Sequence, residues 1–585
     1  METIAAQIGG AAITLTQDGL TIRLPRSQWS ARHWAWLVNV LTQVLGADWG
    51  WVLAPTAIAV GASAADSAAP RWKPLVIDGL SYLLFVLLIP PAHTLRKLYA
   101  AFDWSRIDAQ CAAVYKNQER GAPAYAPQVL FRILVLMFIS GTPFESATLQ
   151  RLQTDVAWRW FVGLGVLRPL PDAGTLCRFR KRVGVARFEA ILVTLLEVCD
   201  QAGLIGHLES YFDCTGVEAS ASQATPYERA VILAKALSAY LDEETGGAPA
   251  VSPAQIAAIV LEVLGAKHPS LQEVQPAQLV ASQAHLEAEW ARTVKSPPQW
   301  WQRLRQELTR LKTQVLGAPQ AHLEHLREVA RQLVPSLPQA FGNPDAAVGH
   351  TRTDGTLCGY RSGLLVDAKR RMIVAVIVVA LSSVEAPLVI QALDKQYAIF
   401  GRYPKRLGLD SAFDRDAVHA YLETHDIAGG ITVRSRPGAA GVFHADAFVW
   451  NSQEQLVCPN GAQMAQVKEP DAKGVAVYRA CGACAQCPLL KQCLTAKQQQ
   501  KSAAPQRELQ INPAAHQRAQ RSRERSRSPE GRALRRRRFG SEGLFGHLNT
   551  YHNGDKAPYR SGAMDTLAQV LVAFVANLET LAAAA

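Results

Sequence analysis

The pattern of apolar and polar positions changes character several times along the chain. From about residue 71 to 205, apolar residues recur with helical spacing, as in PQVLFRILVLMFIS and ARFEAILVTLLEVCDQAG. Residues 224–342 are again helical, and their clearest amphipathic segments are WWQRLRQELTRLKTQVL and AHLEHLREVARQLV. The pattern therefore predicts an all-helical domain and a second, separate block of helices.

Strand patterns stand on both sides of that second block. HLESYFDCTGVEAS predicts a strand that ends near Asp213, and LCGYRSGLLVDAKRRMIVAVIVVALSS predicts more strands after residue 343. EAPLVIQALDKQYAIFG favours a helix, and KRLGLDSAF favours a short buried strand with Asp410 at its end. AVHAYLETHDI and GITVRS add a helix and a strand. Together they predict an α/β domain with a mixed sheet, into which residues 224–342 are inserted.

Residues 1–70 predict a small accessory module whose function is not legible. ITLTQDGLTIRL alternates around Asp18-Gly19 and predicts a hairpin, SARHWAWLVNVLTQVLG predicts a helix, and GASAADSAAP is typical of a linker. No secretory signal pattern opens the chain, so we expect no export. The apolar run Leu80–Pro91 is shorter than a membrane span and predicts a buried helix.

Much of the positive charge of the chain is concentrated in one short segment. The 585 residues carry a formal net charge of +12. Ten arginines and two glutamates lie within residues 518–538, which contribute +8. Such a run either contacts nucleic-acid phosphates or is simply a solvated, disordered stretch. A second basic segment, CRFRKRVG at 177–184, either clamps DNA through Arg178, Arg180, Lys181 and Arg182 or is an ordinary exposed helix face.

Five of the ten cysteines cluster between residues 458 and 493. They are Cys458, Cys481, Cys484, Cys487 and Cys493, and the last four come from CGACAQCPLLKQC. A CxxC knuckle lets two thiolates reach one ion, which predicts a structural zinc site with four sulfur ligands; an iron–sulfur centre or unmetallated thiols are the alternatives. Four thiolates would leave no open position for catalysis.

Three acidic residues at the edges of apolar segments are the candidate catalytic groups: Asp213, Asp410 and Glu542. Mg²⁺ prefers carboxylate oxygens, and two-metal phosphoryl transfer needs several of them around two ions. An Asp on a central strand, an Asp at a neighbouring strand end and a Glu on a helix would complete such a site. Taken singly, each acid is more often a solvated or capping group, and Glu542 can be the first-turn acid of a helix capped by Ser541.

These residues and their order along the chain resemble the DDE-type transposases of bacterial insertion sequences. In the helical part the resemblance rests on AYAPQVLFRILVLMFISG and RWFVGLGVLRPLPDAGTLCRFRKRV, and in the second part on DCTGVEA, GYRSGLLVDAKRRMIVAVIV, LDSAF and EGLFGHLN. It implies an RNase H-like catalytic domain, with Asp213, Asp410 and Glu542 as catalytic residues and ligands of two Mg²⁺ or Mn²⁺ ions. It also favours Cys458, Cys484, Cys487 and Cys493 as zinc ligands, with Cys481 as the alternative.

The resemblance is not complete around the glutamate. The family often has Tyr seven residues before it and Lys seven after it, where this chain has Arg535 and Asn549. Arg538 matches a frequent arginine. Asp410 is followed by Ala412 and Phe413 in place of the common Gly-Tyr pair. We expect DNA contacts from Arg535, Arg536, Arg537, Arg538 and Asn549.

The expected organisation follows. It consists of an accessory module (1–70), a helical DNA-binding domain (71–205), an RNase H-like catalytic domain (206–223, 343–437 and 531–585), a helical insertion (224–342) and a Cys-rich, basic insertion (438–530). The resemblance implies a transposase that binds terminal inverted repeats and target DNA as a dimer or higher assembly, in the bacterial cytoplasm at the nucleoid, with no membrane partner. The alternatives are a nuclease without strand transfer and a transposase-derived DNA-binding regulator.

Overall fold

A computed structural model describes residues 4–8, 11–16, 19–23, 79–114, 125–142, 144–166, 168–219, 221–245, 251–293, 299–314, 322–337, 340–341, 343, 345–351, 355–432, 442–481, 484–500 and 505–584. The chain divides into two compact units. One comprises Met1–Leu136 and Glu145–Phe179, and the other comprises Met137–Phe144 and Arg180–Ala585. The division falls inside two helices, so it differs from the boundary expected near residue 205.

The first unit begins with three antiparallel strands, β1 (Ile4–Ile8), β2 (Ala11–Thr16) and β3 (Gly19–Arg23). Thr16 pairs with Gly19, which confirms the predicted hairpin. The turn residues 17–18, the helix expected at 30–46 and the linker expected at 61–70 lie outside the described residues.

Helices make up the described part of 79–201, as the apolar spacing predicts. They are α3 (Gly79–Leu88), α4 (Thr94–Ala100), α5 (Ser105–Cys111), α6 (Pro127–Ile139), α7 (Glu145–Thr154), α8 (Val156–Val162) and α9 (Ala173–Gln201). Gly184, with a φ of 72°, interrupts α9. The helix predicted to be buried at 80–91 is only partly so, because Leu87 and Leu88 are 58% exposed.

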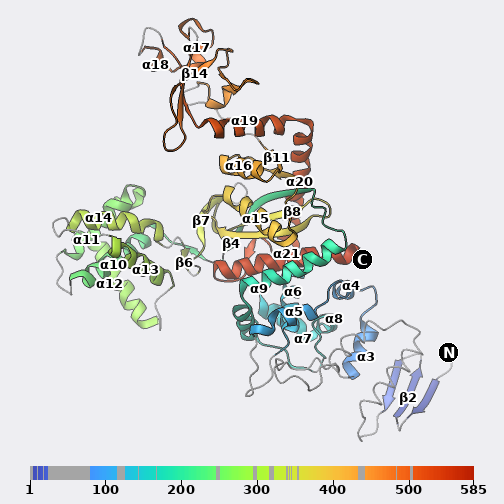
Figure 1. Ribbon diagram of the computed structural model, residues 1–585. Coiled ribbons are helices and arrows are strands. Elements are labelled where there is room, and N and C mark those ends of the chain that lie inside the picture. Colours follow the sequence, from blue (N-terminus) through green and yellow to red (C-terminus); the bar gives the residue numbers. More distant parts are fainter. Residues whose placement is uncertain are drawn as a thin grey trace. The chain divides into compact units, whose positions relative to one another are not determined.

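The second unit is built on a mixed sheet (Figure 1). Its strands are β4 (Glu209–Ala219), β7 (Ala347–Thr351), β8 (Gly355–Asp367), β9 (Met372–Ala380), β10 (Arg406–Leu409), β11 (Ala428–Ile431) and β17 (Lys556–Ala557). Strand order is β11-β10-β4-β8-β7, with β9 on β8 and β17 on β4. β10 runs parallel to β4 and β11, whereas β8 is antiparallel to β4, β7 and β9. The strand that carries Asp213 does not end near it but continues to Ala219, because β8 pairs along its whole second half.

Helices pack on this sheet or on one another beside it, among them α15 (Ala386–Phe400), α16 (Asp416–Thr424), α19 (Pro513–Arg527), α20 (Pro529–His552) and α21 (Gly562–Ala584). α21 is long and apolar enough to cross a membrane, but 72% of its most apolar window is buried inside the protein. The side-chain amide of Asn577 also pairs with both backbone groups of Ile373 on β9, at 2.9 Å each. α21 is therefore a core helix of the sheet.

The helices between β4 and β7 have a core of their own. They are α10 (Pro226–Thr245), α11 (Pro253–Gly265), α12 (Pro276–Thr293), α13 (Gln299–Gln314) and α14 (His322–Leu333), and residues such as Leu237, Val260 and Leu304 are fully buried among them. The two-residue strands β5 (Ser222–Gln223) and β6 (Ala340–Phe341) pair at the ends of this segment. The chain thus leaves the sheet and returns to it at one place.

The Cys-rich part forms a small β module. It contains β12 (Val449–Trp450), β13 (Leu456–Val457), β14 (Met464–Lys468), β15 (Ala476–Ala480), α17 (Leu490–Cys493), α18 (Ala496–Gln500) and β16 (Glu508–Ile511). Phe448, Leu456 and Met464 are among its buried core residues.

The arginine-rich segment that follows is ordered helix, not a disordered run. It forms α19 (Pro513–Arg527) and the start of α20, and Ser528 separates them. The Ser528 hydroxyl accepts a 3.1 Å hydrogen bond from the N–H of Gly531 and so caps α20. The alternative that a helix begins at Ser541 is wrong, because α20 begins at Pro529 and Glu542 lies in its interior.

Candidate active site and metal centres

Asp213 and Asp410 are brought together by the parallel pairing of β4 and β10. Gly408 lies opposite Tyr211 in this parallel pair. Two residues further along each strand, Asp410 therefore lies next to Asp213. Asp410 directly follows β10, and its Oδ1 accepts a 2.7 Å hydrogen bond from the N–H of Ala412. The prediction of a short strand with Asp410 at its end is confirmed.

Helix α20 packs closely on the neighbouring strands, and Gly430 makes room for it. A Cβ on Gly430 of β11 would lie 2.7 Å from Cδ2 of Leu534, whereas one on Gly408 would make only an ordinary 3.6 Å contact with Cβ of Arg538. Any larger residue at Gly430 would push Leu534 away. This close approach carries α20 over the strand that bears Asp213.

Arg538 links two of the three acids. Its Nη1 donates a 2.5 Å hydrogen bond to Oδ2 of Asp213, and its Nη2 lies 3.8 Å from Oε1 of Glu542, one helical turn further on. Arg538 and Asp213 are largely buried, with side chains 12% and 19% exposed, whereas Glu542 is 60% exposed. The three predicted acids and this arginine therefore occupy one region of the sheet surface.

The electrostatics of Asp213 fit a cation-binding carboxylate. Burial raises the pKa of Asp213 to about 6; Arg538 and the N–H of Cys214 lower this pKa, while Asp410 and Glu385 raise it. A buried carboxylate beside other acids gains most from a nearby positive charge. Hard oxygen donors of this kind suit Mg²⁺ or Mn²⁺, so the residues present fit the implied ions.

Sequence reasoning missed a second ion pair near Asp213. Arg361 on β8 lies opposite Gly216 and contacts Glu385 at 3.3 Å, and Glu385 directly precedes α15. Glu385 stands in the predicted helix segment EAPLVIQALDKQ, where nothing distinguishes it from a solvated acid at a helix start. Only the fold shows that Glu385 lies close enough to raise the pKa of Asp213.

The other predicted residues of α20 differ in what their side chains contact. Arg537 donates two hydrogen bonds, of 2.8 and 2.7 Å, to the carboxylate of Glu209, and Arg535 donates to the backbone oxygen of Ser526 at 3.0 Å. Arg536 is exposed. Asn549 is half-buried, and its side-chain oxygen lies close to Gly554. Of these residues, Arg536 presents the freest surface for a phosphate.

The basic segment of α9 has exposed and buried members. Arg178, Lys181 and Arg182 are exposed, and Arg178 donates a 2.9 Å hydrogen bond to Thr175. Arg180 instead is 5% exposed, and its guanidinium lies 3.9 Å from the ring centroid of Tyr559. The prediction that Arg180 contacts DNA does not agree with this position, because its guanidinium is buried in a cation–π contact with Tyr559.

Four of the cysteines gather in the β module. Cys458 and Gly461 form a turn through a 2.8 Å backbone hydrogen bond, and Cys484 and Cys487 form a second one at 3.1 Å. Burial raises the pKa of Cys493, and Cys484, Cys458 and Cys487 raise it further, whereas Arg507 lowers it. Cys481 is exposed. Three cysteines in two turns and a fourth nearby cysteine fit a sulfur-bound zinc ion.

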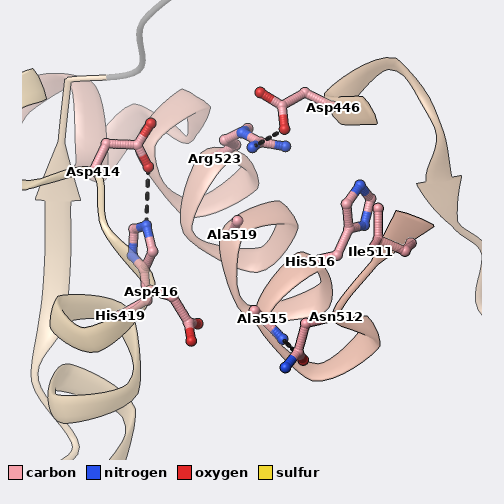
Figure 2. Close-up of a pocket in the computed structure, with 10 residues that line it drawn as sticks. All are labelled: Asp414, Asp416, His419, Asp446, Ile511, Asn512, Ala515, His516, Ala519 and Arg523. Carbon is pink, nitrogen blue, oxygen red and sulfur yellow. Dashed lines mark hydrogen bonds and ion pairs between the residues drawn. The ribbon is translucent and has the colours of Figure 1, made fainter. Parts of the chain in front are cut away.

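A polar hollow of about 230 Å³ lies between α16, α19 and the β module. Figure 2 shows Asp414 facing His419, at 2.9 Å, and Arg523 reaching Asp446, at 2.5 Å. Arg518 contacts Asp416 through two hydrogen bonds of 2.7 and 2.8 Å. These charges pair with one another across the hollow, so we interpret it as a polar contact between the β module and the helices beside the sheet. Its lining residues are Asp414, Asp416, His419, Asp446, Ile511, Asn512, Ala515, His516, Ala519 and Arg523.

Comparison with known families adds two matches. A transposase domain (DUF772) matches residues 85–182, which run from the end of α3 to the first third of α9. A transposase DDE domain matches residues 457–582, which include the Cys-rich module, α19, α20 and most of α21. No curated protein and no solved structure matches the chain.

Proposed function

The chain belongs to the DDE transposases of insertion sequences, and on that premise we propose that it moves its own element by metal-dependent DNA cleavage and strand transfer. The adjacency of Asp213 and Asp410, with Glu542 on the helix above them, carries this proposal. An acid on a central strand, another just after the parallel neighbouring strand and a third on a helix are the arrangement expected of an RNase H-like catalytic domain, which we propose for this sheet.

Asp213, Asp410 and Glu542 would hold two divalent ions. Such ions, when bound, neutralise the scissile phosphate and make a water or a DNA 3′-hydroxyl a better nucleophile. Arg538 keeps the Asp213 carboxylate ionised and oriented, because its guanidinium donates to Oδ2. Glu542 is exposed and one turn away, so it can turn toward the other two acids when ions and DNA are present.

Exposed basic residues supply the DNA contacts in this proposal. Arg536, Arg178, Lys181 and Arg182 are exposed to solvent, and neutralisation of phosphates by Arg and Lys dominates DNA affinity. The partners are the terminal inverted repeats and the target DNA. Since two ends must be held together, the active form is a dimer or a higher assembly, and it acts at the nucleoid.

The Cys-rich module would be stabilised by one zinc ion on Cys458, Cys484, Cys487 and Cys493. A small β module with a short core gains much of its stability from such an ion. Its two thiol turns and the clustering of charge around Cys493 support this ligand set.

DNA duplexes that carry the two ends of the element test the function. With Mg²⁺, the purified chain should nick each end and join pre-cleaved ends to a target, and Asp213→Asn should abolish cleavage while end binding is retained. Asp426→Asn, at an exposed position, is the matched control. Cleavage without joining indicates a nuclease, binding without either step indicates a regulator, and undiminished cleavage by Asp213→Asn would refute the site.

A further inference from the structure

The C-terminus of α20 is closed by a residue in the left-handed conformation. The helix ends at His552, and the next residue, Asn553, has a φ of 56° and donates its N–H to the backbone oxygen of Leu548, five residues back. A left-handed residue of this kind commonly ends a helix. In this last turn the rings of His547 and His552, five residues apart, face each other, with their Nε2 atoms 3.3 Å apart.

Glu579 of α21 completes a trio with these two histidines. Nε2 of His552 lies 3.3 Å from Nε2 of His547 and 3.2 Å from Oε2 of Glu579, and Nε2 of His547 lies 3.9 Å from the same oxygen. Among the described residues, this trio alone has its potential ligand atoms within 4.8 Å of one another. Neither the acids of the active site nor the cysteines of the β module are drawn so closely together.

These spacings match one face of a metal tetrahedron. Zinc binds imidazole nitrogen and carboxylate oxygen at about 2.0–2.2 Å, so neighbouring ligand atoms in a tetrahedral site stand about 3.3–3.5 Å apart. Two edges of the trio, 3.3 and 3.2 Å, have nearly this length, and the third, 3.9 Å, shortens if the exposed His547 ring moves slightly.

A backbone carbonyl on the far side of the ring fixes the orientation of His552. His552 is 1% exposed, and its Nδ1 lies 3.1 Å from the backbone oxygen of Phe138. A proton on Nδ1 that is donated to this carbonyl leaves the lone pair of Nε2 pointing at His547 and Glu579. Metal-binding histidines are usually held in this way by a backbone carbonyl or a carboxylate.

We propose that His547, His552 and Glu579 bind one divalent transition-metal ion of the zinc class, which fastens the end of α20 to α21. Two imidazoles and one carboxylate suit Zn²⁺, Ni²⁺ or Co²⁺ rather than Mg²⁺. Three protein ligands leave a fourth position for water, and the half-exposed His547 gives the ion access from solvent. This ion is separate from the ions of the proposed active site and from the zinc of the Cys-rich module.

Metal content measures this site without any assay of activity. The full-length chain is stripped with a chelator, reloaded with Zn²⁺, desalted and analysed for zinc, in parallel with His547→Ala, Glu579→Gln and the control His350→Ala at an exposed histidine of β7. The zinc on the cysteines is common to all four proteins. The proposal expects His547→Ala and Glu579→Gln to hold about one zinc fewer per chain than the other two proteins.

Melting temperatures show whether a variant loses zinc only because it is unfolded. Added Zn²⁺ should raise the melting temperature of the stripped wild-type chain and of His350→Ala, with an at least tenfold higher Zn²⁺ concentration needed for His547→Ala, as expected for loss of a metal ligand. His547 is half-exposed, so its replacement should leave the fold unchanged. Equal zinc contents in wild type and His547→Ala, or identical melting responses, would overturn the proposal, whatever the outcome of the DNA assays.

Discussion

Arg538 and Asp213 are 325 residues apart in the sequence, and their side chains form a 2.5 Å hydrogen bond between α20 and β4. Arg538 also lies one turn before Glu542, so a single guanidinium orders β4 and α20 against each other. The ion pair is largely buried, so removal of one partner leaves the other charge buried without a partner and is more damaging than the loss of an exposed pair.

Replacement of Arg538 by methionine should therefore impair both fold and activity. Asp213 would lose its partner while it stays buried, and the expected loss is about 1–3 kcal/mol in the free energy of unfolding. DNA cleavage at neutral pH should fall at least about tenfold, since the carboxylate is less ionised and less well placed. Arg536→Met, at an exposed neighbour, is the control for urea unfolding and for cleavage; an equal effect of the two changes would contradict this role of Arg538.

The packing of α20 on β11 predicts a contrast between two glycines. Gly430→Val should destabilise the chain by about 1–3 kcal/mol, because its side chain would collide with Leu534. Gly546→Ala lies on the exposed side of α20 with nothing within 4 Å of the new Cβ, and should be neutral or stabilise by up to about 1 kcal/mol. Thermal unfolding of both variants measures the difference, and the packing argument fails if Gly430→Val melts like the wild type.

Asp565 should make stability depend on pH. It is 0% exposed near the start of α21, and burial raises its pKa from 3.8 to about 7. Between these values the folded chain keeps a proton that the unfolded chain releases. The stabilising contribution is therefore complete below about pH 4 and is lost as the pH rises to about 7.

Asp565→Asn removes this titration. At pH 8 the variant should be more stable than the wild type by up to a few kcal/mol, since one pKa unit corresponds to about 1.4 kcal/mol. Near pH 4 the two proteins should be almost equal. Urea unfolding at several pH values gives the comparison, with the exposed Asp426→Asn as control; parallel pH profiles for wild type and Asp565→Asn would show that Asp565 is not protonated in the fold.

The proposed cysteine ligands predict that replacement of Cys484, but not of nearby Cys481, releases zinc. Cys484→Ser should release the zinc of the β module and lower its stability by several kcal/mol, because metal binding and folding are coupled in small modules. Cys481→Ser, three residues away and exposed, should retain the metal. Elemental analysis and protease resistance of the module report on both; retention of zinc by Cys484→Ser, or its loss from Cys481→Ser, would favour a different ligand set.

The sequence predicted the parts of the fold whose patterns are local. The helices from α3 to α9, the β2–β3 hairpin, β10, α15 and α16 follow directly from apolar spacing. The end of β4 was misjudged at Asp213, because pairing with β8 extends a strand beyond what its own residues indicate. The start of α20 was misjudged because a run of like charges reads as unfolded until its ion pairs with other elements, such as Arg537 with Glu209, are known.

The sequence singles out three acids that the fold brings into one region, but it does not show what surrounds them. Asp213, Asp410 and Glu542 stand out because each follows or opens an apolar segment. Arg538 was expected to contact DNA, whereas in the fold it contacts Asp213, and Arg180 was expected on the surface, whereas it packs on Tyr559. Such roles depend on which segments the sheet brings together, and no local pattern encodes them.

The central claim is that three acids from β4, the end of β10 and α20 hold divalent ions in one site. Iron-directed cleavage of the protein backbone tests it most directly: Fe²⁺ replaces Mg²⁺ on the DNA-bound chain, and ascorbate and peroxide then generate radicals that cut the backbone near the ion. The account predicts cuts near residues 213, 410 and 542 together, all suppressed by excess Mg²⁺ and all lost in Asp213→Asn. Cuts at these places that persist in Asp213→Asn, or cuts near only one of them, would contradict a shared site.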